Sequence, residues 1–224
     1  MDKEKFGIFI GRFQSFHLGH QSVIDQIITD GLTPIIFVGS SQEFNTEKNP
    51  YHVQDRMKMI QLVYPDIKVF AIQDKSCWDE WHTLLTNSIK LVVTTELSDI
   101  TMYCHDKEED RHDKFTFRGK DYFNEFYSKM YEIDGMSVKE LVISDIPVRA
   151  KLIREDLEAN KHFLDPRVYR FLSSMSLKVG TTYSINAIPC TIVGYNYDSD
   201  YSIKVESPKG LPMSYRPGQL KERL

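Results

Sequence analysis

Two histidines and an arginine lie close together near the start of the chain, with two glycines among them. They are Arg12, His17 and His20, in the stretch GRFQSFHLGH. Imidazole and guanidinium groups donate hydrogen bonds to phosphate oxygens, and glycine lets the backbone approach a ligand closely. A single histidine here would indicate a helix cap or a core residue, but packing alone hardly explains this set. The stretch predicts a phosphate site, in which Gly11 permits a sharp turn and Gly19 leaves space between the imidazoles.

The elements on either side place this stretch at a strand-to-helix turn. The apolar run at residues 6–10 predicts a buried strand, and the apolar residues of 21–29 recur at helical spacing. In a parallel α/β sheet such a turn lies at the carboxyl ends of the strands, where ligands bind. The free amides of the first helical turn also favour an anion.

Further strands and helices are predicted from the apolar pattern of the following residues. The unbroken run Ile35–Val38 is typical of a strand covered on both faces. A helix is predicted over 53–63, and the aromatic-rich segment 115–131 is expected to pack in the core at helical spacing. The remaining strands of the sheet are predicted at residues 68–72, 89–95 and 140–144.

The composition narrows the class of protein. The chain has 224 residues, of which 41% are hydrophobic and 27% charged, and a net charge of −4. These values are ordinary for a globular protein and argue against a general nucleic-acid or membrane surface. The three cysteines, Cys77, Cys104 and Cys190, are far apart and predict reduced thiols. With no apolar leader or spanning segment in the sequence, we expect a cytoplasmic protein.

The stretch GRFQSFHLGH is similar to the GRFQPFHxGH signature of the HxGH nucleotidyltransferase superfamily. It most closely resembles the nicotinamide mononucleotide (NMN) adenylyltransferase branch found in archaea and in some bacterial two-domain enzymes. Ser15 replaces the usual proline, which would only stiffen the turn. The resemblance implies an α/β, Rossmann-like, doubly wound parallel sheet of the nucleotidyltransferase type. It also implies that the ATP phosphates are bound by Gly11, Arg12, Phe13, His17, Gly19 and His20.

A second segment, GSSQEFNTEKNPYHVQDRMKMI, is similar to the pattern GSxQ…T…NP…xxRxxMI of the same family. The resemblance implies that NMN is bound by Gly39, Ser40, Gln42 and Arg56. For Arg56 two roles stay open at this point, a contact on the substrate side or a structural ion pair.

Both tryptophans, Trp78 and Trp81, lie three residues apart and share one face if a helix begins at Trp78. For Trp78 we expect core packing. In the resembling family an aromatic residue at this point stacks on the nicotinamide ring, and Trp81 aligns best with it. A flat indole suits the positively charged pyridinium ring of NMN.

A third stretch, SDIPVRAKL, predicts another helix start with an arginine on its first turn, and hence a second anion site. It resembles the ISxTxIR motif of the family, whose arginine grips the ATP phosphates. Ser144, Val148 and Arg149 match this motif. Ile146 replaces the usual threonine, so we expect altered affinity and retained activity.

The resemblance covers about residues 5–172 and predicts a nucleotidyltransferase domain at 1–175. Residues 176–224 are too few for the Nudix domain of some relatives. Turn residues there separate short strands at 182–185, 190–195 and 201–205, which predict a small all-β, barrel-like module. Its function is open between a structural extension and a surface that binds a protein or nucleic acid.

The activity that the resemblance implies is adenylyl transfer from ATP to NMN, giving NAD and pyrophosphate. The catalytic residues would be His17, His20, Arg12 and Arg149, with Mg²⁺ held by substrate phosphates and water and no protein metal site. We expect a homo-oligomer that binds neither membrane nor nucleic acid. Three alternatives stay open: a pantetheine-phosphate adenylyltransferase, a cytidylyltransferase, and a non-catalytic nucleotide-binding regulator. A preference for nicotinic acid mononucleotide is open as well.

Overall fold

The chain forms two compact units, residues 1–153 and residues 154–224, and each is described by itself. The computed structural model describes residues 4–44, 46, 48–104, 112–125, 128–141, 148–175, 182–185, 188–196 and 202–215.

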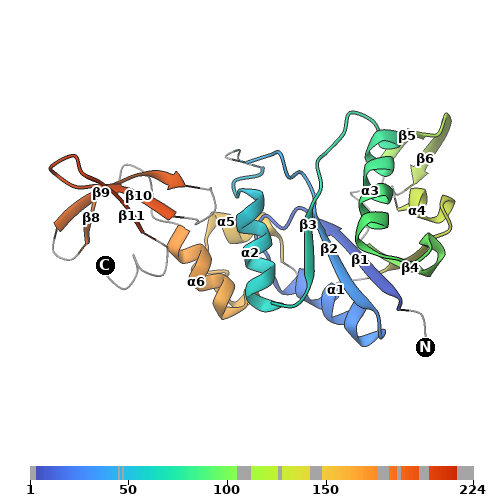
Figure 1. The fold of residues 1–224 in the computed structure, drawn as a ribbon, viewed down its shortest axis with the longest axis horizontal. Helices are drawn as coiled ribbons and strands as arrows, with labels where there is room; N and C mark the ends of the chain where they lie inside the picture. Colours follow the sequence, from blue (N-terminus) through green and yellow to red (C-terminus); the bar gives the residue numbers. More distant parts are fainter. Residues whose placement is uncertain are drawn as a thin grey trace. The chain divides into compact units, whose positions relative to one another are not determined.

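The first unit is built on a five-stranded sheet of order β3-β2-β1-β4-β7, in which every neighbouring pair is parallel (Figure 1). From the central strand β1 the chain adds β2 and β3 on one side, and β4 and β7 on the other. This order confirms the doubly wound sheet. The strands are β1 (Phe6–Gly11), β2 (Thr33–Val38), β3 (Lys68–Ala71), β4 (Ile100–Cys104) and β7 (Ser137–Glu140).

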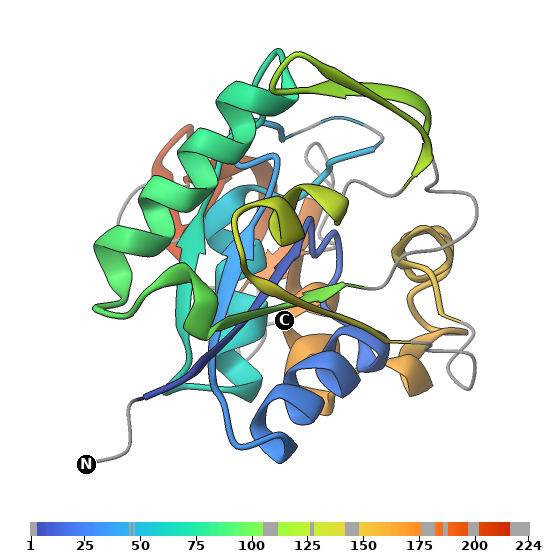
Figure 2. The same ribbon diagram turned by 90° about the vertical axis from the view of Figure 1, so that its right-hand side faces the viewer.

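Helices cover both faces of this sheet (Figure 2). On one face α1 approaches β1 so closely that a Cβ added at Gly7 would lie 2.4 Å from the Ile27 side chain. On the other face α3 buries Leu85 and Ile89 in one core cluster with apolar residues of β1 and β2. The helices of this unit are α1 (Leu18–Thr29), α2 (Val53–Val63), α3 (Trp78–Val92), the 3₁₀ turn η1 (Leu97–Asp99) and α4 (Lys129–Ile133), and helix α5 (Ala150–Glu155) contains the division between the units.

The order of the strands fixes where a ligand can enter. The chain leaves β1 toward β2 on one side, while β4 is added on the other side, so the topological switch point lies between β1 and β4. Ligands of open α/β sheets bind at such a point, beyond the carboxyl ends of the strands. The GRFQSFHLGH turn directly follows β1 and therefore lies at this place. No helix among the described residues is both long and apolar enough to cross a membrane.

The strand expected at residues 89–95 is wrong, because α3 continues to Val92. Ile89 and Val93, four residues apart, are both buried, whereas Leu91 is 86% exposed. The apolar run thus follows a helical period at the end of α3, and the next strand of the sheet is β4, which the sequence reading missed.

Of the segment 115–131, Phe126 and Tyr127 lie outside the described residues and residues 129–131 belong to α4, but the part 115–125 is not helical. It contains most of a hairpin, β5 (His112–Phe117) and β6 (Lys120–Glu125), closed by Arg118 and Gly119, whose φ angles are +50° and +71°. Phe115 and Phe117 are buried, whereas Lys114 and Thr116 next to them on β5 are exposed, which is the alternation of a strand. The last strand of the sheet ends at Glu140, earlier than expected, and residues 142–147 lie outside the described part.

The second unit contains helix α6 and a four-stranded antiparallel sheet of order β11-β10-β9-β8, which confirms the small all-β module. Its first strand has the predicted bounds, and its last was not predicted. The chain divides into its two compact units after residue 153. The domain boundary expected at residue 175 stays a prediction. Its elements are η3 (Lys161–Phe163), α6 (Pro166–Met175), β8 (Thr182–Ile185), β9 (Ile188–Asn196), β10 (Ser202–Glu206) and β11 (Pro212–Tyr215).

Candidate active site

The turn after β1 is tightly packed although it carries polar residues. Ser15, Phe16 and His17 are buried, whereas Arg12 is exposed. Phe13 has a φ of +49°, a conformation that costs a side-chain-bearing residue about 1 kcal/mol or more. The predicted sharp turn is therefore made at residue 13, and the glycine before it makes room for the ring: a Cβ at Gly11 would lie 2.9 Å from the Phe13 ring.

The two histidines face each other at the start of α1. His17 is the N-cap residue of α1, and its ring stacks on that of His20 with 3.8 Å between the centroids. The backbone N–H of His17 donates to Nδ1 of His20 at 3.4 Å. The ring of Phe16 lies nearly parallel to that of His20 at 5.9 Å. Because Nδ1 accepts, a neutral His20 carries its proton on Nε2 and can donate it to an anion.

The helix start between these histidines suits an anion. The first turn of α1 has no acidic residue, so its free amides and positive dipole end are not neutralised by the helix itself. His17 caps α1, as a single histidine at this point would, and the same turn also contains a second donor, His20.

Gly19 is the point where the third motif meets the first. A Cβ at Gly19 would lie 3.2 Å from the imidazole of His17 and 3.4 Å from Cγ1 of Val148. Val148 is buried, and the exposed Arg149 follows it directly before α5. The structure thus brings the Arg149 segment to the histidine turn, while Ser144 lies outside the described residues. That both arginines converge with the imidazoles on one polyphosphate stays a prediction.

The turn after β2 lies against the turn after β1. The N–H of Gly39 donates to the carbonyl of Gly11 at 2.9 Å, and Ser40 has a φ of +47°. Gln42 pairs with Asp74, donating from Nε2 to Oδ2 and accepting the Asp74 N–H at Oε1, both at 3.1 Å. These bonds join the loop after β2 to the loop after β3, and a role of Gln42 toward NMN stays a prediction.

A buried amide pair also connects the motifs, and the sequence reading did not assign it. Gln14 donates from Nε2 to Oδ1 of Asn49 at 3.3 Å and accepts the Tyr51 N–H at 3.1 Å. The backbone N–H of Asn49 donates to the Thr46 hydroxyl at 2.9 Å. The family pattern contains both GRFQ and T…NP, and this joint occurrence could have indicated that Gln14, Thr46 and Asn49 are linked by hydrogen bonds.

Arg56 is completely buried, and its guanidinium donates to backbone carbonyls of both turns. Burial lowers the pKa of Arg56 to about 10, which leaves it protonated at neutral pH. The hydrogen-bond partners of Arg56 are backbone carbonyl groups and not the ion pair that was considered, and a contact with NMN stays a prediction.

Trp81 lies at the correct edge of the sheet for its predicted role. Helix α3 begins at Trp78, as expected, just beyond the carboxyl end of β3. Trp81 is half-buried and packs both against the main core and against the β5–β6 hairpin. Trp78 packs edge-on to Trp81 at 6.3 Å and to Phe115 at 6.0 Å. The docking role of Trp78 is confirmed, and stacking of Trp81 on nicotinamide stays a prediction.

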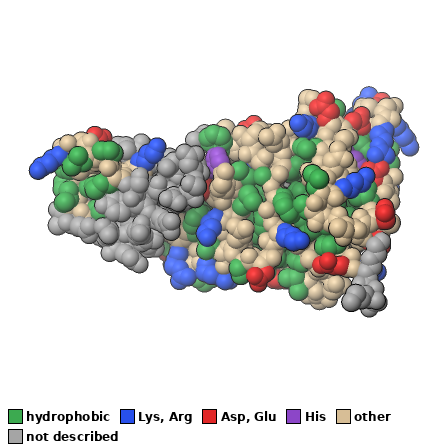
Figure 3. Space-filling view, in the orientation of Figure 1, with side chains coloured by type: hydrophobic (Ala, Val, Ile, Leu, Met, Phe, Trp, Pro, Cys, Tyr) green, Lys and Arg blue, Asp and Glu red, His purple; other side chains and the backbone are tan. Residues whose placement is uncertain are grey.

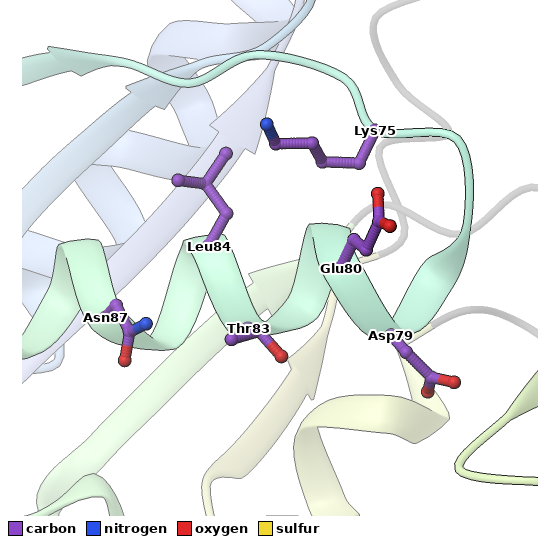
Figure 4. Close-up of a pocket in the computed structure, with 6 residues that line it drawn as sticks. All are labelled: Lys75, Asp79, Glu80, Thr83, Leu84 and Asn87. Atoms are coloured by element: carbon purple, nitrogen blue, oxygen red, sulfur yellow. The ribbon is translucent and has the colours of Figure 1, made fainter.

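An open groove of about 410 Å³ lies along the solvent face of α3 (Figure 4). In the close-up the Lys75 side chain extends over Leu84, while Asp79 points away from it. The groove contains none of the predicted site residues. On the face of the molecule shown in Figure 3, acidic and basic side chains are interspersed. Its lining consists of Lys75, Asp79, Glu80, Thr83, Leu84 and Asn87.

The described residues include no group of three or more histidine, cysteine, aspartate or glutamate side chains placed to hold a metal ion.

Comparison with known proteins gives a family and a set of relatives. Residues 8–177 match the family model described as cytidylyltransferase-like. A nicotinamide-nucleotide adenylyltransferase of Methanolobus tindarius is 44% identical over 66 residues, which are 29% of this chain and 38% of that protein. The aligned part thus spans little more than a third of the relative.

Solved structures share the fold. NadR protein in complex with NAD and AMP-PNP superimposes with a TM-score of 0.58 at 19% identity, over 83% of this chain and 50% of that one. A bifunctional NMN adenylyltransferase/ADP ribose pyrophosphatase from Francisella tularensis, complexed with AMP and a manganese ion, gives 0.55 at 20% identity. That match covers 77% of this chain and 49% of the other.

Proposed function

The chain belongs to the cytidylyltransferase-like family, and we propose that it transfers the adenylyl group of ATP to NMN, giving NAD and pyrophosphate. The observation that carries this proposal is the stacked pair of His17 and His20 at the N-terminus of α1, at the switch point of the sheet. The similarity to a nicotinamide-nucleotide adenylyltransferase supports NMN as the acceptor.

In this reaction a 5′-phosphate oxygen of NMN attacks the α-phosphorus of ATP in line. The new P–O bond forms as the bond to the α–β bridging oxygen breaks, and its electron pair leaves with pyrophosphate. No protein nucleophile is needed, so the work of the protein is to position two anions and to stabilise charge.

In this proposal His20 stabilises the transition state. Its Nδ1 accepts a backbone N–H, and its ring is enclosed by those of His17 and Phe16, so its orientation is fixed before substrate binds. Its Nε2–H then donates to an α-phosphate oxygen, on which charge develops. His17 donates to the same phosphate, and Arg12 and Arg149 hold the outer phosphates and the departing pyrophosphate.

The acceptor lies on the β2 and β3 side of the turn in this proposal. Gly39, Ser40 and Gln42 line the NMN phosphate and ribose, and Trp81 stacks on the nicotinamide ring. The half-buried state of Trp81 supports this role, because its docked edge would fix the plane of the exposed part.

In this proposal Mg²⁺ is held by the substrate phosphates and water. When bound to the phosphates it would neutralise part of their charge. The Francisella neighbour with AMP and manganese supports the use of a divalent ion. A cytoplasmic location and a homo-oligomeric state remain part of the proposal.

The test is product identification with purified protein. ATP and NMN should yield NAD and pyrophosphate, and His20→Ala should lower kcat by a factor on the order of 10²–10³ while the protein stays folded. Thr29→Ala, at the exposed far end of the same helix, serves as the matched control and should retain kcat. Turnover with phosphopantetheine or CTP but not with NMN would contradict the proposal, as would tight ATP binding without pyrophosphate release.

A further inference from the structure

Arg56 is a positive charge in the interior whose hydrogen bonds all reach across to the site. Its side chain is 0% exposed, and it projects from α2. Nη1 donates to the carbonyl oxygens of Arg12 at 2.9 Å and Gly39 at 2.7 Å. Nη2 donates to those of Ser40 at 3.0 Å and Glu43 at 3.5 Å. One guanidinium therefore spans the turn after β1 and the turn after β2.

The bonds of Nη1 fall on the strained points of these turns. Arg12 immediately precedes Phe13, and Gly39 immediately precedes Ser40, the two left-handed residues of the turns. The carbonyl of a residue belongs to the same peptide plane as the N–H of the next one, so fixing it restricts the following φ. Arg56 thus holds both peptide planes whose unusual orientation shapes the site.

We propose that Arg56 is a positioning residue, which fixes the phosphate-binding turn and the acceptor-binding turn at one separation without touching either substrate. This inference rests on the proposed function, because it assigns the two turns to ATP and NMN. The rate of a reaction between two bound anions depends on the distance between them, so we expect Arg56 to increase the rate of the chemical step.

A direct contact of Arg56 with substrate does not fit its hydrogen bonds. A guanidinium has four N–H groups on its two Nη atoms, and four carbonyl groups occupy them here. The remaining donor, Nε, has no hydrogen-bond partner but is itself buried, so it presents no surface to a ligand. Removing the side chain would leave carbonyls of both turns without their partner and allow the turns to relax.

The experiment compares Arg56→Lys and Arg56→Met with Met59→Ala, a buried control on the same helix that removes core volume. All are assayed with ATP and NMN at a temperature where circular dichroism shows them folded. We expect kcat to fall about a hundredfold in Arg56→Met, less in Arg56→Lys, and little in Met59→Ala, with both KM values changed far less than kcat. Should Arg56→Met not fold, Arg56→Lys carries the comparison.

Two kinetic outcomes would overturn the proposal. If Met59→Ala loses as much kcat as the Arg56 variants, Arg56 acts through stability alone. If KM for one substrate rises while kcat is kept, Arg56 contacts that substrate directly.

Hydrogen exchange separates this inference from the proposed function. If the wild-type protein forms no NAD, the proposed function fails, but the turns can still be examined. Peptides covering residues 12–17 and 39–44 should exchange faster in Arg56→Lys than in Met59→Ala at equal global stability. Equal exchange in both variants would refute the positioning role whatever the enzyme makes.

Discussion

At the scale of single residues, Gly19 shows how closely the proposed site is built. The His17 ring and the Val148 side chain occupy the space that a side chain at this position would need. Two motifs more than a hundred residues apart in the chain therefore come into contact at Gly19, because this residue has no side chain. Gly19 was expected to leave room between the imidazoles, but the two rings stack directly at 3.8 Å, and the space that Gly19 leaves lies against His17 and Val148.

Gly19→Ala should lower kcat about tenfold or more, because the new Cβ would displace the His17 ring by a few tenths of an ångström and misplace a phosphate donor. The matched control is Gly31→Ala, at the other end of α1, where φ is +75° and nothing lies within 4 Å. That change should cost about 1 kcal/mol of stability through backbone strain and leave kcat unchanged. Steady-state kinetics and urea unfolding of both variants check this, and equal kcat values would contradict it.

Residue types carried most of the chemical prediction, but not the role of Arg56. The spacing in GRFQSFHLGH indicated a turn with phosphate donors, because both the glycines and the donors lie within ten residues. The role of Arg56 depends on carbonyls 44 and 17 positions away in the chain, which converge only in the folded sheet. No local pattern distinguishes such an arginine from one that binds a ligand.

At the scale of elements, the least predictable region was α3 together with the hairpin that packs on it. Its apolar residues at 89–93 could follow a strand or a helical period, and the buried positions decide for the helix. The β5–β6 hairpin was hidden because its aromatic residues also fit a helical spacing. Its Arg118-Gly119 turn, with φ positive at both residues, is the hairpin signal that could have revealed it.

The hairpin is held to α3 and α4 around a buried histidine, His82. Its ring lies edge-on to Phe117 at 4.9 Å, and its Nδ1 is 3.5 Å from Oδ2 of Asp134, which also binds Arg118 at 2.6 Å. Burial lowers the pKa of His82, and the Arg118 charge lowers it further, while Asp134, a hydrogen bond with the Met130 backbone and the Asp79 charge oppose this shift. His82 therefore stays neutral in the folded protein at a pH where the unfolded chain takes up a proton.

The consequence is a loss of stability on the acid side. His82 has a lower pKa in the folded protein than its value of 6.5 in the unfolded chain. Above pH 6.5 this difference does not change the free energy of unfolding, and as the pH falls below 6.5 the free energy of unfolding decreases progressively. We expect the urea midpoint to fall between about pH 7.5 and 5.5, and to fall less steeply in His82→Gln. Parallel pH profiles of the two proteins would show that His82 does not cause the loss.

At the scale of the whole molecule, every described residue of the proposed site lies in the first compact unit. The three motifs reach from Gly11 to Arg149, and that unit spans residues 1–153. The doubly wound sheet was predictable because the turns after its strands follow a known motif order, although apolar runs revealed only β1, β2 and β3, and β4 was missed. The domain boundary expected at residue 175 stays a prediction. The all-β module carries none of these residues, and its role as extension or recruiter remains a hypothesis.

The central claim concerns the place where ATP and NMN react. A crystal structure of the full chain with NMN and a non-hydrolysable ATP analogue tests it most directly. The account predicts the α-phosphate within hydrogen-bond distance of His17 and His20, beyond the carboxyl ends of β1 and β4, with the NMN phosphate next to it. A nucleotide bound elsewhere, such as in the groove along α3, with the histidine turn empty, would contradict it.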